Sequence, residues 1–102
     1  LDQDDVGTAI DIAILQNTQS LGTDNDVVSI TDANAIDILG HINTVAGDYT
    51  DLINSRVATV RNIDLGVQSA AGTRDLFVGL IARGAGTWTA SGLRLRLTFL
   101  QD

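Results

Sequence analysis

The sequence contains no cysteine, proline, methionine, lysine or glutamate. Without cysteine the chain forms neither a disulfide framework nor a thiolate metal site, and it has no nucleophilic thiol. All thirteen acids are aspartates and all six strong bases are arginines. Because aspartate is a poor residue for helix interiors, this composition disfavours helix. No apolar run approaches the roughly 18 residues of a membrane span, and no basic-then-apolar leader opens the chain.

What is present indicates one folded domain over residues 1–102. The apolar residues make up 44% of the chain and the charged residues 19%, a balance that supports a small core. Leu1 is an unusual first residue, because initiator removal normally leaves a small side chain. We therefore expect that an N-terminal extension, which once preceded Leu1, is missing from this sequence.

The charges are divided between the two halves of the sequence. Residues 1–55 carry ten aspartates and no arginine, whereas the chain from Arg56 onward carries six arginines and three aspartates. The net charge of −7 argues against nucleic acid or an anionic membrane as the main partner. The two halves can complement each other within one domain or pair between neighbouring copies.

Hydrophobic periodicity predicts several short elements in the first half. Alternating isoleucines predict a strand with one buried face at Thr8–Leu15, although a short helix also fits this stretch. The β-branched run Val27–Ile30 predicts a second strand. Thr31 or Asp32 is then expected to cap a helix of one to three turns, which ends at Gly40.

The middle of the chain allows two interpretations. Apolar residues recur every three or four positions from Ile36 to Val60, which is compatible with one long helix or coiled coil. Glycines and β-branched residues oppose that interpretation. We favour strands at His41–Val45 and Val57–Val67, with a turn at Gly47 and Asp48 before a short segment at Tyr49–Ile53.

The last third carries the clearest strand patterns. Asp75–Arg83 is almost continuously apolar, as expected for a central strand covered on both faces. A glycine-punctuated loop around Trp88 follows. Leucines then alternate with arginines from Leu93 to Leu100, which places Arg94 and Arg96 on one outward face. The chain is therefore expected to be mainly β, an antiparallel β-sandwich of jelly-roll type with at most one short helix.

Catalytic and cofactor motifs are absent from the sequence. His41 is the only histidine, which excludes a histidine-rich metal site, and it is expected at a strand edge. No serine lies in a G-x-S-x-G context, and the glycines near Gly84 match no phosphate-binding loop. We therefore expect no cofactor.

Two groups of acidic residues are candidates for a metal site or a catalytic site. Asp24, Asn25 and Asp26 resemble the opening of a calcium loop, but no glycine or glutamate follows at the required positions. Asp48 and Asp51 could act as an acid and base pair in glycoside hydrolysis. Carbohydrate sites usually also present aromatic platforms, and the chain has only four aromatic residues. Since the strand patterns place Phe77 and Phe99 in the core, only Tyr49 and Trp88 are left for that role. We predict neither a metal site nor catalysis.

Interface candidates are the arginines and the tryptophan of the last third. Trp88 either folds back over the core or anchors a partner surface. Arg94 and Arg96 form either a solvated face or a docking face for an acidic neighbour. The predicted interface residues are Arg74, Arg83, Trp88, Arg94 and Arg96.

Four parts of the sequence carry recognisable motifs, namely Val28–Ala35 with Ile38–Gly40, Ala70–Val78, Ala82–Ala90 and Leu93–Asp102. These segments resemble small structural proteins of tailed bacteriophages. The resemblance covers most of the chain from about residue 8. The resemblance implies a capsid decoration or cement protein: a β-sandwich on the outer capsid surface of the virion, often trimeric, that stabilises the assembled lattice without chemistry. The major capsid protein and further copies of this chain are then its partners.

Two other function classes stay open at this stage. A tail or receptor-binding component would use Trp88, Tyr49 and the acidic loop to contact a host glycan. A hydrolase would depend on Asp48 or Asp51. We rank decoration first, the tail component second and the enzyme third.

Overall fold

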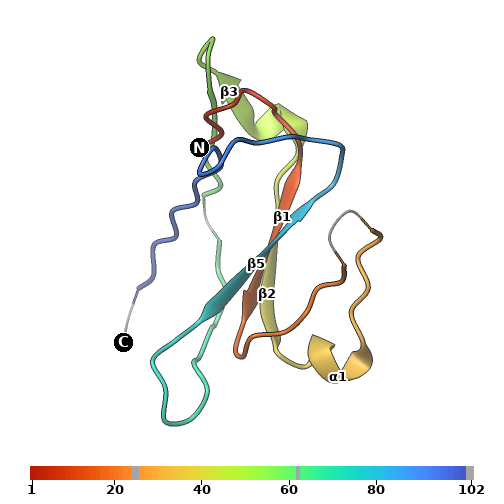
Figure 1. Ribbon diagram of the computed structural model, residues 1–102. Helices are drawn as coiled ribbons and strands as arrows, with labels where there is room; N and C mark the ends of the chain where they lie inside the picture. Colours follow the sequence, from red (N-terminus) through yellow and green to blue (C-terminus); the bar gives the residue numbers. More distant parts are fainter. Residues whose placement is uncertain (24–25, 62, 101–102) are drawn as a thin grey trace.

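The computed structural model describes residues 1–23, 26–61 and 63–100, and it is mainly β, as predicted (Figure 1). One antiparallel sheet has three strands in the order β2-β1-β5, and a second pairs β3 with β4. The elements are β1 (Ile10–Leu15), helix α1 (Asp32–Ala35), β2 (Ile38–Asn43), the 3-10 turn η1 (Ala46–Asp48), β3 (Tyr49–Asp51), β4 (Arg56–Ala58) and β5 (Phe77–Ala82). None of the helices in these ranges is long and apolar enough to cross a membrane.

Strand β1 is the centre of the fold. All six of its residues are buried, whereas the alternation of its isoleucines predicted only one buried face. The difference follows from position, since β1 is flanked by β2 and β5 and is covered above and below. Its isoleucines form the core cluster with Ile42 of β2, and Val67, Trp88, Leu93 and Leu97 pack against that cluster.

Two glycines let covering side chains approach the sheet closely. A Cβ atom at Gly40 of β2 would lie 2.6 Å from Leu65, and one at Gly79 of β5 would lie 2.2 Å from Leu21. Gly40 stands opposite Ile14 and Gly79 opposite Ala13, so the two leucines cover opposite faces of the sheet. The glycines therefore admit the side chains that bury β1 on both sides.

Local signals in the sequence were confirmed where they depend on neighbouring residues. Thr31 caps α1, and its side chain accepts a hydrogen bond from the backbone N–H of Asn34. The turn expected at Gly47 and Asp48 is η1. Helix α1 has one turn and ends at Ala35, so Gly40 does not stop a helix. The alternative of a long helix over residues 36–60 is wrong, because β2, η1, β3 and β4 occupy that region.

Three strand predictions were wrong in whole or in part. Residues 27–30 form no strand, and the strand predicted at Val57–Val67 is limited to the end of β4 at Ala58 in the described residues, which exclude residue 62. The Leu93–Leu100 segment forms only an isolated bridge at Leu93. Alternation specifies which side chains share a face, but a strand also requires a neighbour that completes its hydrogen bonds.

The prediction that Asp75–Arg83 is a central strand was also wrong. It contains β5, which pairs with β1 on one side and lies at the edge of its sheet. Phe77, Val78 and Leu80 are 38%, 42% and 45% exposed. Strand β5 is therefore an edge strand, although its sequence is as apolar as that of a central strand.

We predict that Ile14→Ala lowers the free energy of unfolding by about 2–5 kcal/mol, because it leaves a cavity in the centre of the core. Ile14 is 2% exposed, whereas Ile36 is 81% exposed. The matched change Ile36→Ala is expected to cost less than about 0.5 kcal/mol. Urea unfolding followed by circular dichroism measures both, and equal losses would contradict the position of the core.

Candidate functional site

The most deeply buried polar group is the Asp2 carboxylate, which is 1% exposed. Its Oδ2 accepts a hydrogen bond from the N–H of Gly7 at 2.7 Å. Its Oδ1 accepts bonds from the N–H of Asp4 and from the indole Nε1–H of Trp88, both at 3.2 Å. These donors satisfy a charge that would otherwise be costly to bury.

The backbone around Asp2 joins distant parts of the chain. Asp2 and Arg56 exchange two backbone hydrogen bonds of 2.7 Å, and Asp2 also forms an antiparallel bridge with Leu93. Next to the Asp2–Leu93 bridge, Leu1 pairs with Arg94. The Arg94 N–H donates to the Leu1 carbonyl, and the Leu1 amino group donates to the Arg94 carbonyl. The N-terminal residues are therefore hydrogen-bonded to β4 on one side and to the C-terminal segment on the other.

A side-chain contact reinforces this junction. Arg56 Nε donates to Asp5 Oδ1 at 2.5 Å. The hydrogen bond with Asp5 and the charge of that carboxylate raise the pKa of Arg56 above its ordinary value. This ion pair joins Arg56, the first arginine of the chain, to the acidic N-terminal segment.

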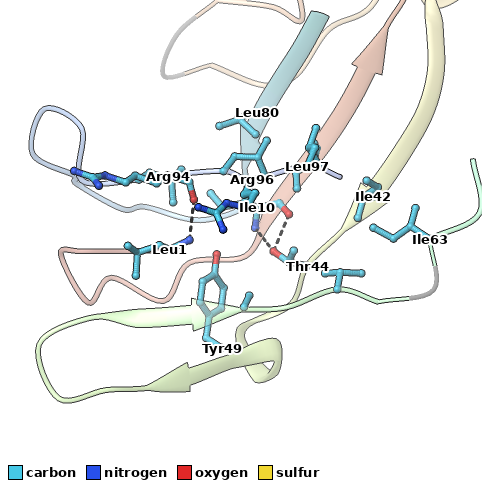
Figure 2. Close-up of a pocket in the computed structure, with 15 residues that line it drawn as sticks. Leu1, Ile10, Ile42, Thr44, Tyr49, Ile63, Leu80, Arg94, Arg96 and Leu97 are labelled. Carbon is cyan, nitrogen blue, oxygen red and sulfur yellow. Dashed lines mark hydrogen bonds between the residues drawn. The ribbon is translucent and has the colours of Figure 1, made fainter. Parts of the chain in front are cut away.

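A groove opens beside the junction, between the three-stranded sheet and the chain that covers it (Figure 2). Its floor is apolar and includes Ile10, Ile12, Ile42 and Leu80. The covering chain supplies the remaining side chains. These are Leu1, Thr44, Tyr49, Ala58, Val60, Ile63, Leu93, Arg94, Leu95, Arg96 and Leu97.

The size and the charge of the groove limit its chemistry. Its volume of about 110 Å³ is below the roughly 300 Å³ at which pockets hold drug-sized ligands. Arg94 and Arg96 are its only charged side chains within the described residues, and both are exposed. The groove is therefore an apolar seam with a cationic margin, suited to contact with a surface.

The structure separates the predicted interface residues. It brings Arg94 and Arg96 together at the groove. Trp88 is half-buried over the core and bonded to Asp2, which is the folded-back arrangement. Arg74 is exposed in the segment between β4 and β5.

Arg83 takes part in a charge cluster around the buried Asp11 that the sequence patterns did not reveal. The carboxylate of Asp11, the second residue of β1, accepts a short hydrogen bond from Arg83 Nε and lies 3.5 Å from His41 Nε2. Strand alternation could have indicated that Asp11 interrupts a buried strand, but its partners are 30 and 72 residues away. His41 itself lies on the edge strand β2 and is exposed, as expected.

The acidic residues considered for catalysis accept hydrogen bonds from nearby backbone N–H groups. Asp48 accepts a hydrogen bond from the Val45 N–H, and Asp51 accepts one from the Ile53 N–H. Asp24 and Asn25 of the calcium-loop candidate lie outside the described residues. Elsewhere in the chain, the described residues include no cluster of three or more histidines and carboxylates that could hold a metal ion.

Comparison with protein-family models, with curated proteins and with solved structures finds no match for this chain.

We predict that Asp2→Ala lowers the free energy of unfolding by roughly 1–3 kcal/mol, because buried donors lose their acceptor. Trp88 is the only tryptophan, so its emission maximum should move to longer wavelength as the indole is released. The exposed Asp64 provides the control, since Asp64→Ala removes the same charge without a buried partner. An unchanged emission spectrum in Asp2→Ala would contradict the central role of Asp2.

Proposed function

We propose that the chain is a non-enzymatic structural protein of a virion, a decoration or cement protein that binds the assembled major capsid lattice from outside and stabilises it. The proposal joins the sequence resemblance to tailed-phage structural proteins with one structural observation. That observation is the large accessible surface of the folded chain, on which many large hydrophobic side chains are exposed.

The surface is larger than a compact monomer requires. The chain exposes 7485 Å², whereas a compact monomer of its mass exposes about 5,500 Å². Its radius of gyration is 14.5 Å, against about 13 Å for a compact domain of this length. Large hydrophobic residues contribute to the excess, including Leu52 and Ile53 at the tip of the β3–β4 hairpin and Phe99 and Leu100 near the C-terminus. Such a surface is typical of a protein that works in contact with partners.

A β-sandwich of jelly-roll type is part of this proposal. The chain around Val67, Leu93 and Leu97 covers one face of the three-stranded sheet. In the proposed sandwich these segments would form the second layer, although the described residues there include no named strand. Contact with the capsid lattice would supply neighbours for them.

The cationic margin of the groove provides the docking mechanism. Arg94 and Arg96 are exposed beside an apolar seam, in a protein whose net charge is −7. A concentrated positive margin favours an acidic patch on the partner and orients the approach of an otherwise anionic protein.

The alternative of a glycan-binding tail component has less support from these side chains. It depends on Trp88 and Tyr49 as contact aromatics, and both are half-buried. Copy number distinguishes the two functions, because a lattice component is present in hundreds of copies per virion and a tail component in few.

We predict that the purified chain saturates capsids stripped of decoration and that its affinity falls as salt is raised from 50 to 500 mM, because exposed ion pairs are screened. Arg94→Gln with Arg96→Gln should weaken binding at least tenfold and flatten the salt dependence. Co-sedimentation with capsids measures both effects.

The control for this experiment is Arg61→Gln, which removes an exposed arginine that does not line the groove. Binding that is indifferent to salt and to the double substitution would refute docking through the arginine margin. Failure to bind capsids under any condition would refute the decoration function.

A further inference from the structure

The outer edge of β5 has free backbone hydrogen-bonding groups. The Arg83 N–H donates to the Ala9 carbonyl at 2.9 Å, which fixes the alternation of the β1–β5 ladder. Residues of one parity, such as Gly79 and Ile81, direct their backbone groups toward β1. Val78, Leu80 and Ala82 therefore direct theirs away from the sheet, and no described residue pairs with them as a strand.

The same edge is apolar and carries none of the usual protection against pairing. Edge strands are normally blocked by charged residues, proline or bulges. Residues 77–82 contain no charge and no proline, and their register with β1 is regular. Phe77, Val78 and Leu80 are each more than a third exposed. The outer edge of β5 therefore has the properties of an edge that pairs with another strand in the functional protein.

There is room for a partner along this edge. A hollow of about 600 Å³ is lined by Leu80, Ile81 and Ala82 on one side. Residues 21–23, 26 and 28 and parts of residues 84–88 line the other sides. The surface excess of about 2,000 Å² over a compact monomer also exceeds the ~800 Å² that each partner buries in a standard interface.

Charge complementarity selects a second copy and its register. If two β5 strands pair antiparallel about a twofold axis at Gly79, Val78 faces the partner's Leu80 and Phe77 faces the partner's Ile81. Two residues further from the axis, the same register places Asp75 opposite the partner's Arg83. Arg83 uses its Nε for Asp11, which leaves its terminal nitrogens for this contact. A register centred on Leu80 would instead place Phe77 opposite Arg83.

We propose that two copies of this chain pair edge to edge through β5, in antiparallel orientation about a twofold axis at Gly79, to form a continuous six-stranded sheet. The inference does not depend on the capsid as partner, because it concerns the chain alone. Since the pair is closed by a twofold axis, it is a dimer and not the trimer that the resemblance implies.

Site-specific disulfide formation tests the register, because the natural sequence has no cysteine to interfere. Residues that face each other in a hydrogen-bonded antiparallel pair have Cα atoms about 5.5 Å apart, which suits a disulfide. Mixed Val78→Cys and Leu80→Cys chains should cross-link under mild copper–phenanthroline oxidation, whereas neither variant should do so alone. Val45→Cys, at an exposed position away from the edge, measures random collision.

The outcomes separate cleanly on a non-reducing gel. Cross-linking in the mixture well above the Val45→Cys level supports the pair. Cross-linking of Leu80→Cys alone overturns the Gly79-centred register, and cross-linking at the control level in all samples overturns edge pairing.

A second variant tests the hydrogen bonds without cysteine chemistry. Ala82→Pro removes an N–H that points away from the protomer's own sheet, so its Trp88 emission should be unchanged while the dimer weakens at least tenfold. Ala82→Ser keeps the N–H and should dimerise normally. Light scattering over a concentration series measures both; equal dimerisation of the two variants, or a trimer for the unaltered chain, would overturn the proposal.

Discussion

The folded arrangement depends on the burial of one carboxylate, that of Asp2. A charge removed from water is stable only when donors surround it, and here the donors come from Gly7, Asp4 and Trp88. Meeting that requirement places the N-terminus between β4 and the C-terminal segment and brings Trp88 onto the core. The groove with its arginine margin exists because these segments converge there.

How much of the fold was predictable depended on the range of each interaction. The Thr31 cap and the turn at Gly47 involve residues within four positions of each other, and both were predicted. The alternation in Leu93–Leu100 suggested the strongest strand, yet only Leu93 and Arg94 pair there, with Asp2 and Leu1, and the described residues beyond Arg94 have no strand partner. Strand pairing is set by tertiary contacts that a local pattern does not contain.

The candidate site shows the same limit. Alternation predicted that Arg94 and Arg96 share an exposed region, and both line the groove. The groove itself was not predictable, because its floor comes from β1, β2 and β5 and its walls from both ends and the middle of the chain (Figure 2). The roles of Asp2 and Asp11 were equally hidden, since their partners Trp88 and Arg83 are 86 and 72 residues away.

The proposed pair and the proposed docking function reinforce each other geometrically. In an antiparallel pair, a twofold axis perpendicular to the sheet leaves the same face of both copies on one side. Leu80 lies both on the β5 edge and in the floor of the groove, so the two grooves would be adjacent on that side. Two copies of Arg94 and Arg96 would then meet one partner surface, and the second contact would form at high effective concentration. Pairing through β5 would thus convert a weak, screened ion contact into attachment strong enough to reinforce a lattice.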